Sequence, residues 1–438
     1  MATPTTAARP DLHAEVEVTI DALAHGGAGV ARLDGYVLFV RDAIPGDRVR
    51  AEVTKRKRAY GEARTLEVLA PSPERIPPVA RHPGAPWQVL PYDRQLEVKA
   101  QQVDDALRRI GRLDGFALEP IVPSAEQWRY RNKVEFSFGT AADGALVCGF
   151  HAAGSWEEIV DMEDCLLVSE RVNAMRRTVV DFCRAQGLEA WDRRTQQGFL
   201  RNLVIREGRR TGQLQVRLVT SPGELDGEAF AAAAAADGTF WTQAAGMGET
   251  THGGLTEHIA GAPALEEELS GLRYAIAPDA FFQTNTEMAE ALYGIAVDYA
   301  ELRGWERVYD LYCGIGTIGL ALAGRAGEVW GVEVVEQAVA NAIANARRNE
   351  VSNAQFFAGD VRLAMRDLVE RAGRPDVSTI WRSARRTSPA KKRALSISLR
   401  RALAIASAIA SSTISRPHTS PARGASDRPM VPMPQNRS

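Results

Sequence analysis

The sequence predicts an α/β protein with three parts: a small N-terminal β-barrel, a central α+β domain and an incomplete doubly wound sheet. Short strand-like runs broken by turns predict the barrel, and strands mixed with helices predict the central domain. A β-α-β-α-β order that begins at residue 307 predicts the doubly wound sheet. The length of 438 residues agrees with about three domains.

Residues 12–70 are expected to form the barrel, with strand-like runs at 16–20, 35–40 and 49–53. Four consecutive cations follow the third run, with Tyr60 beside them: Lys55, Arg56, Lys57 and Arg58. Neutralisation of phosphates together with stacking of bases requires this combination of residues. A charged hairpin edge that resists aggregation is the alternative interpretation.

A proline-rich linker is expected at 71–91, followed by a central α+β domain at 92–270 that begins with an amphipathic helix. A second cluster of cations and aromatic residues stands just before a strand-like run at 133–138. Its members are Trp128, Arg129, Tyr130, Arg131 and Lys133. This cluster is a second candidate RNA-binding face, and surface ion pairs are the alternative.

The segment 271–375 carries the pattern of a parallel sheet that binds a nucleotide. A buried strand at 307–312 runs into Gly314, Gly316 and Gly319, which match G-x-G-x-x-G. The second strand ends at Glu333 and the third closes with Asp360. Taken alone, this pattern is also typical of a nicotinamide-dependent oxidoreductase.

Asp310 decides between the two kinds of nucleotide, because it lies four residues before Gly314. A carboxylate at this strand end would repel a pyrophosphate, whereas it would stabilise the sulfonium and ammonium of S-adenosyl-L-methionine. The residue therefore favours the methyl donor. Two structural alternatives stay open: Asp310 can cap the turn that follows it, and Glu333 can cap the next helix.

These motifs resemble the RNA uridine C5-methyltransferase family, which acts on transfer and ribosomal RNA. The resemblance rests on a TRAM-like barrel, the YRNK element at Tyr130–Lys133, the FFQTN element at Phe281–Asn285 and the run DLYCGIGTIGLALA from Asp310. It implies a Rossmann-like, S-adenosyl-L-methionine-dependent enzyme that methylates uridine in structured RNA, with ribosomal RNA favoured over transfer RNA. The cofactor-binding residues that it implies are Gln283, Asp310, Tyr312, Gly314, Gly316, Thr317, Glu333 and Asp360.

The catalytic elements of that family are missing from this sequence. Carbon 5 of uracil is a weak nucleophile, so the family adds a cysteine thiolate to carbon 6 and removes the carbon 5 proton with a base. No Cys occurs after Cys313 and no Glu after Glu370, and the DPPR and SCNP elements are absent. We therefore expect no catalytic residue, a buried Cys313 without chemistry, and a sheet that stops after three strands. A non-catalytic RNA-binding protein is the alternative.

The composition changes abruptly at residue 376. Residues 376–438 contain twelve Lys and Arg but only two acids, and they are rich in Ser and Pro. Such a segment is expected to be largely disordered. Two interpretations are open: the segment is a basic arm that binds nucleic acid, or it is translated in a shifted reading frame.

The cysteine and charge content predicts the setting of the protein. Four cysteines without a CxxC pair fit a reducing cytoplasm, and no run is long and apolar enough to cross a membrane. Family members with an iron–sulfur cluster carry three cysteines in the region that here reads 79–87, and of the four cluster positions only Cys165 remains. We expect no cluster, no other metal, and a monomer whose partner is RNA.

Overall fold

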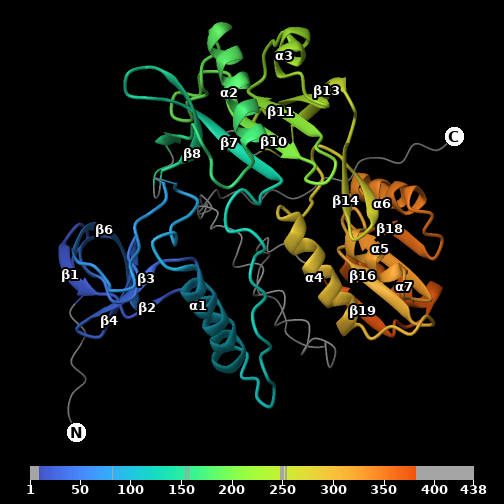
Figure 1. The fold of residues 1–438 in the computed structure, drawn as a ribbon, viewed down its shortest axis with the longest axis horizontal. Helices are drawn as coiled ribbons and strands as arrows, with labels where there is room; N and C mark the ends of the chain where they lie inside the picture. Colours follow the sequence, from blue (N-terminus) through green and yellow to red (C-terminus); the bar gives the residue numbers. More distant parts are fainter. Residues whose placement is uncertain are drawn as a thin grey trace, which may run out of the picture.

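The computed structural model describes residues 9–380, except 81, 153–154, 156, 247–250 and 252–253. Its elements form three regions in chain order, shown from blue to orange in Figure 1. The basic segment that the sequence analysis begins at residue 376 lies outside the described residues beyond Ile380.

The N-terminal region is a curled six-stranded sheet in which β1 also contacts β3. The buried residues Val18, Leu38 and Val49 belong to its core. The three predicted strands are present, but β2, β3 and β6 were not predicted, and Lys55 and Arg56 lie within β5 rather than after it. The strands are β1 (Glu15–Thr19), β2 (Ala22–Leu23), β3 (Gly29–Leu33), β4 (Tyr36–Arg41), β5 (Arg48–Arg56) and β6 (Tyr60–Ala70).

The central region begins with helix α1 (Tyr92–Asp105), which continues as a π-helical turn over Ala106–Ile110. Its seven strands form one sheet in the order β13-β12-β11-β10-β7-β8-β9. Helices α2 (Glu170–Ala185) and α3 (Gly227–Ala234) supply apolar side chains to the core of this sheet. The strands are β7 (Lys133–Thr140), β8 (Leu146–His151), β9 (Ile159–Asp161), β10 (Leu200–Glu207), β11 (Leu214–Thr220), β12 (Gly238–Gln243) and β13 (Leu255–Gly261).

The C-terminal region opens with a hairpin and helix α4, which lead into a parallel sheet. The sheet order is β18-β17-β16-β19, with helices between successive strands. Its elements are β14 (Leu265–Leu269), β15 (Leu272–Ile276), α4 (Thr286–Tyr299), β16 (Arg307–Leu311), α5 (Thr317–Ala323), β17 (Glu328–Glu333), α6 (Glu336–Arg348), β18 (Ala354–Ala358), α7 (Val361–Ala372) and β19 (Val377–Ile380).

The expectation that this sheet stops after three strands was wrong. Strand β19 pairs in parallel with β16, with Val308 opposite Val377. The break in composition misled the prediction, because the four residues of β19 still suit a strand and complete the edge beside β16. The chain runs outward from β16 through β17 to β18 and then crosses back through α7 to β19 on the other side of β16, so the strand order reverses between β16 and β19. Such a switch point places a crevice at the carboxyl ends of these strands.

Among the helices of the described residues, none combines the length and the apolar character that a membrane span requires.

Candidate cofactor site and RNA-binding surfaces

Asp310 anchors the loop that follows β16. Its side chain is fully buried, and its Oδ2 accepts a hydrogen bond from the backbone N–H of Gly319 at 2.9 Å. Its Oδ1 accepts from the Thr379 hydroxyl on β19 at 3.0 Å. Burial raises the pKa of Asp310 to about 6. The turn-capping role left open by the sequence is therefore present, and the carboxylate lies beneath the loop.

The glycines shape this loop as the motif requires. Gly314 and Gly316 have φ values of 56° and 83°, a left-handed conformation that favours glycine. A Cβ atom on Gly319 would lie 2.9 Å from Asp310 Oδ2, so glycine permits the close contact between α5 and β16. Tyr312 also has a positive φ, 66°, and its ring is half-buried beside the core at α7.

Thr317 is fixed by two tyrosines from outside the parallel sheet. Its hydroxyl lies 3.1 Å from the Tyr293 hydroxyl on α4, and its carbonyl accepts from the Tyr274 hydroxyl at 3.3 Å. Burial raises the pKa of both tyrosines, to about 12 for Tyr293. These two contacts were not foreseen, because nothing in the sequence links residue 274 or 293 to the glycine loop.

Glu333 and Asp360 lie at the carboxyl ends of the neighbouring strands β17 and β18. Glu333 Oε2 accepts from the Gly314 N–H at 3.2 Å, and its Oε1 accepts from the N–H groups of Val334 and Val335, which precede α6, so Glu333 does not cap this helix. Asp360 caps α7, and its hydrogen bonds with Arg362 lower its pKa to about 2. The parallel sheet thus brings Asp310, Glu333 and Asp360 to one edge.

The YRNK and FFQTN elements meet, although about 150 residues separate them. Asn132 is 2% exposed, and its Nδ2 donates to the Gln283 carbonyl at 2.7 Å and to the Thr286 hydroxyl at 3.0 Å. Arg131 forms a backbone bridge with Asn285. The charge pattern of YRNK pointed to its cations, and Asn132, which is uncharged, gave no signal in the sequence.

All four cysteines are buried and free. Burial raises the pKa of Cys165 to about 11, that of Cys183 to about 12, and those of Cys148 and Cys313 further. Cys313 is 6% exposed and belongs to an apolar cluster, which confirms its predicted burial. Burial therefore disfavours the thiolate form of each of these cysteines.

The region predicted to correspond to the iron–sulfur site does fold together. His82 Nε2 lies 3.3 Å from Cys165 Sγ, and burial lowers the pKa of His82 to about 4. Among the described residues, no group of three or more His, Cys, Asp or Glu could hold a metal ion. Cys165 therefore has a neutral histidine as its neighbour rather than only apolar residues.

The basic run of the barrel, Lys55–Arg58, divides into two pairs. Lys55 forms an ion pair with Glu62 at 2.6 Å, and Arg56 forms one with Asp11 at 2.9 Å. Lys57 and Arg58 are exposed, and neither side chain has an ion pair with another described residue. The Tyr60 ring packs against Phe39 at a centroid distance of 5.5 Å.

The second cluster of cations is more deeply engaged in the structure. Arg129 contacts Asp164 through two hydrogen bonds of 3.0 and 3.1 Å and also pairs with Glu170. Lys133 pairs with Glu135 at 2.7 Å, and burial lowers the pKa of Lys133. Arg131 is half-buried, with an unpaired Nε. The ion-pair interpretation thus describes Arg129 and Lys133, while their contact with RNA stays a prediction.

Comparison with known proteins agrees with this arrangement. Residues 13–66 match the TRAM domain family, and residues 264–372 match the family described as tRNA (uracil-5-)-methyltransferase. An RNA methyltransferase of Halalkalibacterium halodurans is 36% identical over 360 residues, covering 80% of this chain and 78% of that protein. One from Thermosynechococcus vestitus is 38% identical over 362 residues, covering 78% of each chain.

A solved structure shows the same architecture. The tRNA (uracil-54, C5)-methyltransferase of Pyrococcus abyssi, in complex with S-adenosyl-L-homocysteine, aligns with a TM-score of 0.66 and 28% identity. The alignment covers 79% of each chain. The fold and the loop after β16 thus define the class of S-adenosylmethionine-dependent RNA methyltransferases. Within that class, the chain belongs to the uracil-5 RNA methyltransferase family that carries a TRAM domain. The glycine pattern alone also allowed a nicotinamide-dependent oxidoreductase, and the family found here is a different one.

Proposed function

We propose that this chain binds S-adenosyl-L-methionine and structured RNA, and that it retains these two functions of a uridine C5-methyltransferase without turnover. We favour ribosomal over transfer RNA as the substrate of the ancestral reaction. The buried state of all four thiols carries the proposal of lost turnover. The loop around Asp310 carries the proposal of donor binding.

The residues around the loop suit the donor. S-adenosyl-L-methionine, when bound, supplies an electrophilic methyl group on a positively charged sulfur. Asp310 and Glu333 place two carboxylates at one edge of the sheet, where a cation is stabilised and a pyrophosphate is repelled. We assign binding of the donor to these two residues together with Gln283, Tyr312, Gly314, Gly316, Thr317 and Asp360.

Activation of uracil needs a thiolate and a base, and the sequence has no Cys after Cys313 and no Glu after Glu370, where the family carries both. A protonated, buried thiol neither reaches a substrate nor attacks carbon 6. Cys313 lies in an apolar cluster with Ile315 and Phe356 and is 6% exposed. The residues that directly follow β19 contain no DPPR element, where the family has one. These observations favour a protein that binds both ligands of the reaction but does not join them.

Two measurements test the proposal. Calorimetry should show saturable binding of S-adenosyl-L-homocysteine and none of NADH, and the opposite preference would overturn the assignment of the loop. An assay with tritiated donor and uridine-containing ribosomal RNA should then give no incorporation above a protein-free control. Incorporation would show that turnover survives.

A purely RNA-binding protein is the second candidate, and the exposed pair Lys57 and Arg58 favours it. That function predicts salt-dependent RNA affinity without saturable binding of the donor. The calorimetric titration therefore separates the two candidates directly.

A further inference from the structure

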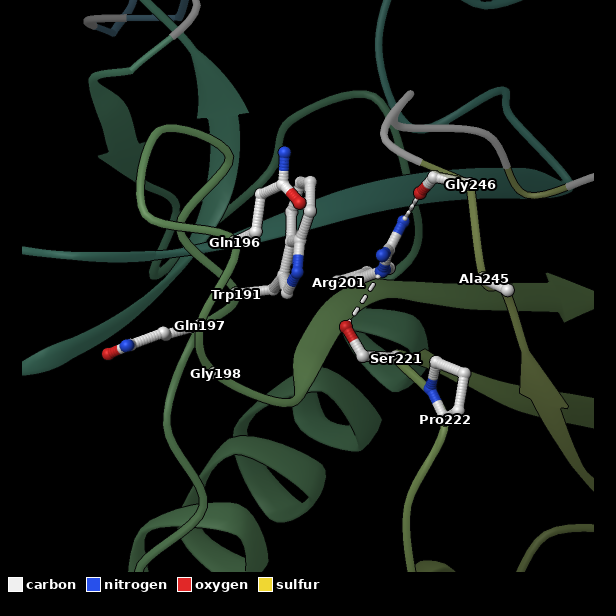
Figure 2. A pocket seen from close by; sticks show the side chains of 9 residues that line it. All are labelled: Trp191, Gln196, Gln197, Gly198, Arg201, Ser221, Pro222, Ala245 and Gly246. Atoms are coloured by element: carbon white, nitrogen blue, oxygen red, sulfur yellow. Dashed lines mark hydrogen bonds between the residues drawn. The ribbon is translucent and has the colours of Figure 1, made fainter.

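Neutral groups help to hold buried charges in this chain. Arg201 lines a pocket of about 410 Å³ in the central region, and its guanidinium lies over the Trp191 ring at 4.0 Å from the centroid (Figure 2). Its Nε donates to the Ser221 hydroxyl at 3.0 Å and its Nη1 to the Gly246 carbonyl at 2.6 Å. Trp191 and Arg201 are only 9% and 4% exposed, so the two planes cover each other. Asp310 is a second buried charge with neutral partners, and it belongs to the loop after β16.

Two neutral groups donate to the buried Asp310 carboxylate. The backbone N–H of Gly319 on α5 donates to Oδ2 at 2.9 Å, and the Thr379 hydroxyl on β19 donates to Oδ1 at 3.0 Å. The titratable groups that interact with Asp310 from the other elements around it are Glu333 on β17, Tyr293 on α4 and Cys313 in the loop. Each of these three is neutral or negative. The two hydrogen bonds therefore stabilise the ionised carboxylate against burial and against the charge of Glu333.

Strand β19 places Thr379 beside Asp310. The two residues are partners in the parallel ladder of β16 and β19. Val377, two residues earlier on β19, faces the same side of the sheet as Thr379 and packs on the apolar core of this region. The Asp376 N–H donates to the Arg307 carbonyl, and the Asp376 Oδ2 accepts from the Arg307 N–H, both at 2.9 Å. These contacts at the start of the strand fix the register that brings the hydroxyl to Asp310.

The hydroxyl is what distinguishes Thr379 from an apolar residue at the same position. A valine would keep the β-branched shape that suits a strand but would remove the donor to Oδ1. The Gly319 donor belongs to the backbone, so it does not depend on a side chain. The Thr379 hydroxyl also lies 3.4 Å from the Tyr309 carbonyl, but the carboxylate is the closer acceptor. Thr379 is thus the side chain through which β19 acts on Asp310.

We propose that Thr379 is a positioning residue for the methyl donor: its hydroxyl orients the Asp310 carboxylate and favours the charged form, which attracts the sulfonium. The proposal rests on the proposed function, since it requires that the loop binds the donor. A residue beyond position 376, where the composition changes, thereby takes part in the donor site. Affinity for the donor then depends on the pairing of β19 with β16.

Calorimetric titrations of the full chain with S-adenosyl-L-methionine at a series of pH values test this role. In the unchanged chain, affinity should rise through the pKa of Asp310, about 6. Thr379→Val should move this rise upward by about one to two pH units, the effect of losing one hydrogen bond to a charged oxygen. At about pH 6.5 the affinity should then be lower by about 3- to 25-fold. Thr379→Ser keeps the hydroxyl and should restore the profile of the unchanged chain.

Ser378→Ala is the matched control. It removes a hydroxyl from the neighbouring position of β19, whose side chain lies on the opposite face of the sheet, and should leave the pH profile unchanged. Urea unfolding without ligand gives a second measurement, because the fall in stability caused by ionisation of Asp310 should extend to higher pH in Thr379→Val by the same one to two units, again an estimate of about that size. A merely structural role would lower affinity or stability at every pH and leave the midpoint in place.

The outcomes separate this role from the proposed function. The same midpoint in Thr379→Val and the unchanged chain, in both measurements, would overturn the role of Thr379. An equal shift in Thr379→Val and Ser378→Ala would also overturn it, because the shift would then come from a general disturbance of β19. An unchanged chain that binds no S-adenosyl-L-methionine at any pH would overturn the proposed function itself, which is a different outcome.

Discussion

The loop after β16 and the basic run of the barrel contrast in how their polar side chains are held. In the loop, the carboxylates of Asp310 and Glu333 both accept hydrogen bonds from backbone N–H groups, and Asp310 is fully buried. In the basic run, two cations have exposed ion pairs and two have none with the described residues. The loop that we propose for the donor is thus fixed by geometry before a ligand arrives. The basic run that we propose for RNA offers mainly charge, which salt screens.

The largest effect is expected for Asp310→Asn, which tests the buried carboxylate of the loop after β16. The pKa of Asp310, about 6, is raised above its ordinary value of 3.8. Ionisation of Asp310 therefore costs folding free energy: its contribution to stability is highest below pH 3.8, falls as the pH rises to about 6, and stays low above that pH. The fall amounts to about 3 kcal/mol.

Asp310→Asn should abolish this fall, as measured by urea unfolding at a series of pH values. In the unchanged chain, affinity for S-adenosyl-L-methionine should rise with pH through about 6, because the ionised carboxylate attracts the sulfonium. S-adenosyl-L-homocysteine, which lacks the sulfonium, should show a shallower rise. A pH profile that is the same in the variant and the unchanged chain would show that Asp310 is not the titrating group.

The second effect concerns Asn132→Ala at the junction of YRNK and FFQTN. Loss of two buried hydrogen bonds, to the Gln283 carbonyl and the Thr286 hydroxyl, should lower the free energy of unfolding by about 2 to 3 kcal/mol. Gln337→Ala, at an exposed position on α6, is the control and should change it by less than about 0.5 kcal/mol. Denaturant titration compares the two variants, and equal stabilities would mean that the junction is not under structural constraint.

A pair of glycine substitutions tests the close packing of α5 against Asp310. Gly319→Ala should destabilise the fold by about 1 to 3 kcal/mol, because the new methyl group meets Asp310 Oδ2 at 2.9 Å. Gly294→Ala, in the interior of α4 with open space around it, should instead stabilise the fold by about 0.5 to 1 kcal/mol. Thermal unfolding should thus shift in opposite directions. A shift in the same direction for both would contradict the packing described around Asp310.

The smallest effect is expected for the exposed cations of the barrel. Replacing Lys57 and Arg58 with Gln should leave stability unchanged and make the slope of log K for RNA against log salt shallower by about 1.4 to 1.8. The matched pair Lys55→Gln and Arg56→Gln should change the slope less, since Glu62 and Asp11 already neutralise those cations. Salt titrations of RNA binding measure both. Equal slopes for the two double variants would contradict this account, because they would show that the ion-paired cations contribute as much to RNA binding as Lys57 and Arg58 do.

Local spacing made much of the fold predictable. The glycine pattern, Asp310 and the acids at the ends of β17 and β18 lie within about 50 residues, and each belongs to a strand end that the sequence marks clearly. Strand β6 was missed because the four cations before it obscured where a strand could start. Strand β19 was missed because the change in composition was taken as the end of the sheet.

Contacts between distant residues could not be predicted. Asn132 reaches Gln283 only where the central and C-terminal regions meet, and Thr379 reaches Asp310 only when β19 pairs with β16. The pocket around Trp191 depends on Arg201 turning toward Ser221 and Gly246 from another strand and loop. The pattern of residues within a single segment does not predict these long-range contacts, because sheet order and strand register determine each of them.

The central claim is that a site shaped for a methyl donor persists without a thiol able to activate uracil. Incubation of the purified chain with S-adenosyl-L-methionine and RNA that contains 5-fluorouridine tests it most directly, since an attacking cysteine would remain covalently attached to that base. We predict non-covalent RNA binding and no adduct after denaturing electrophoresis. A stable protein–RNA band that disappears when Cys313 is replaced by Ala would contradict the account.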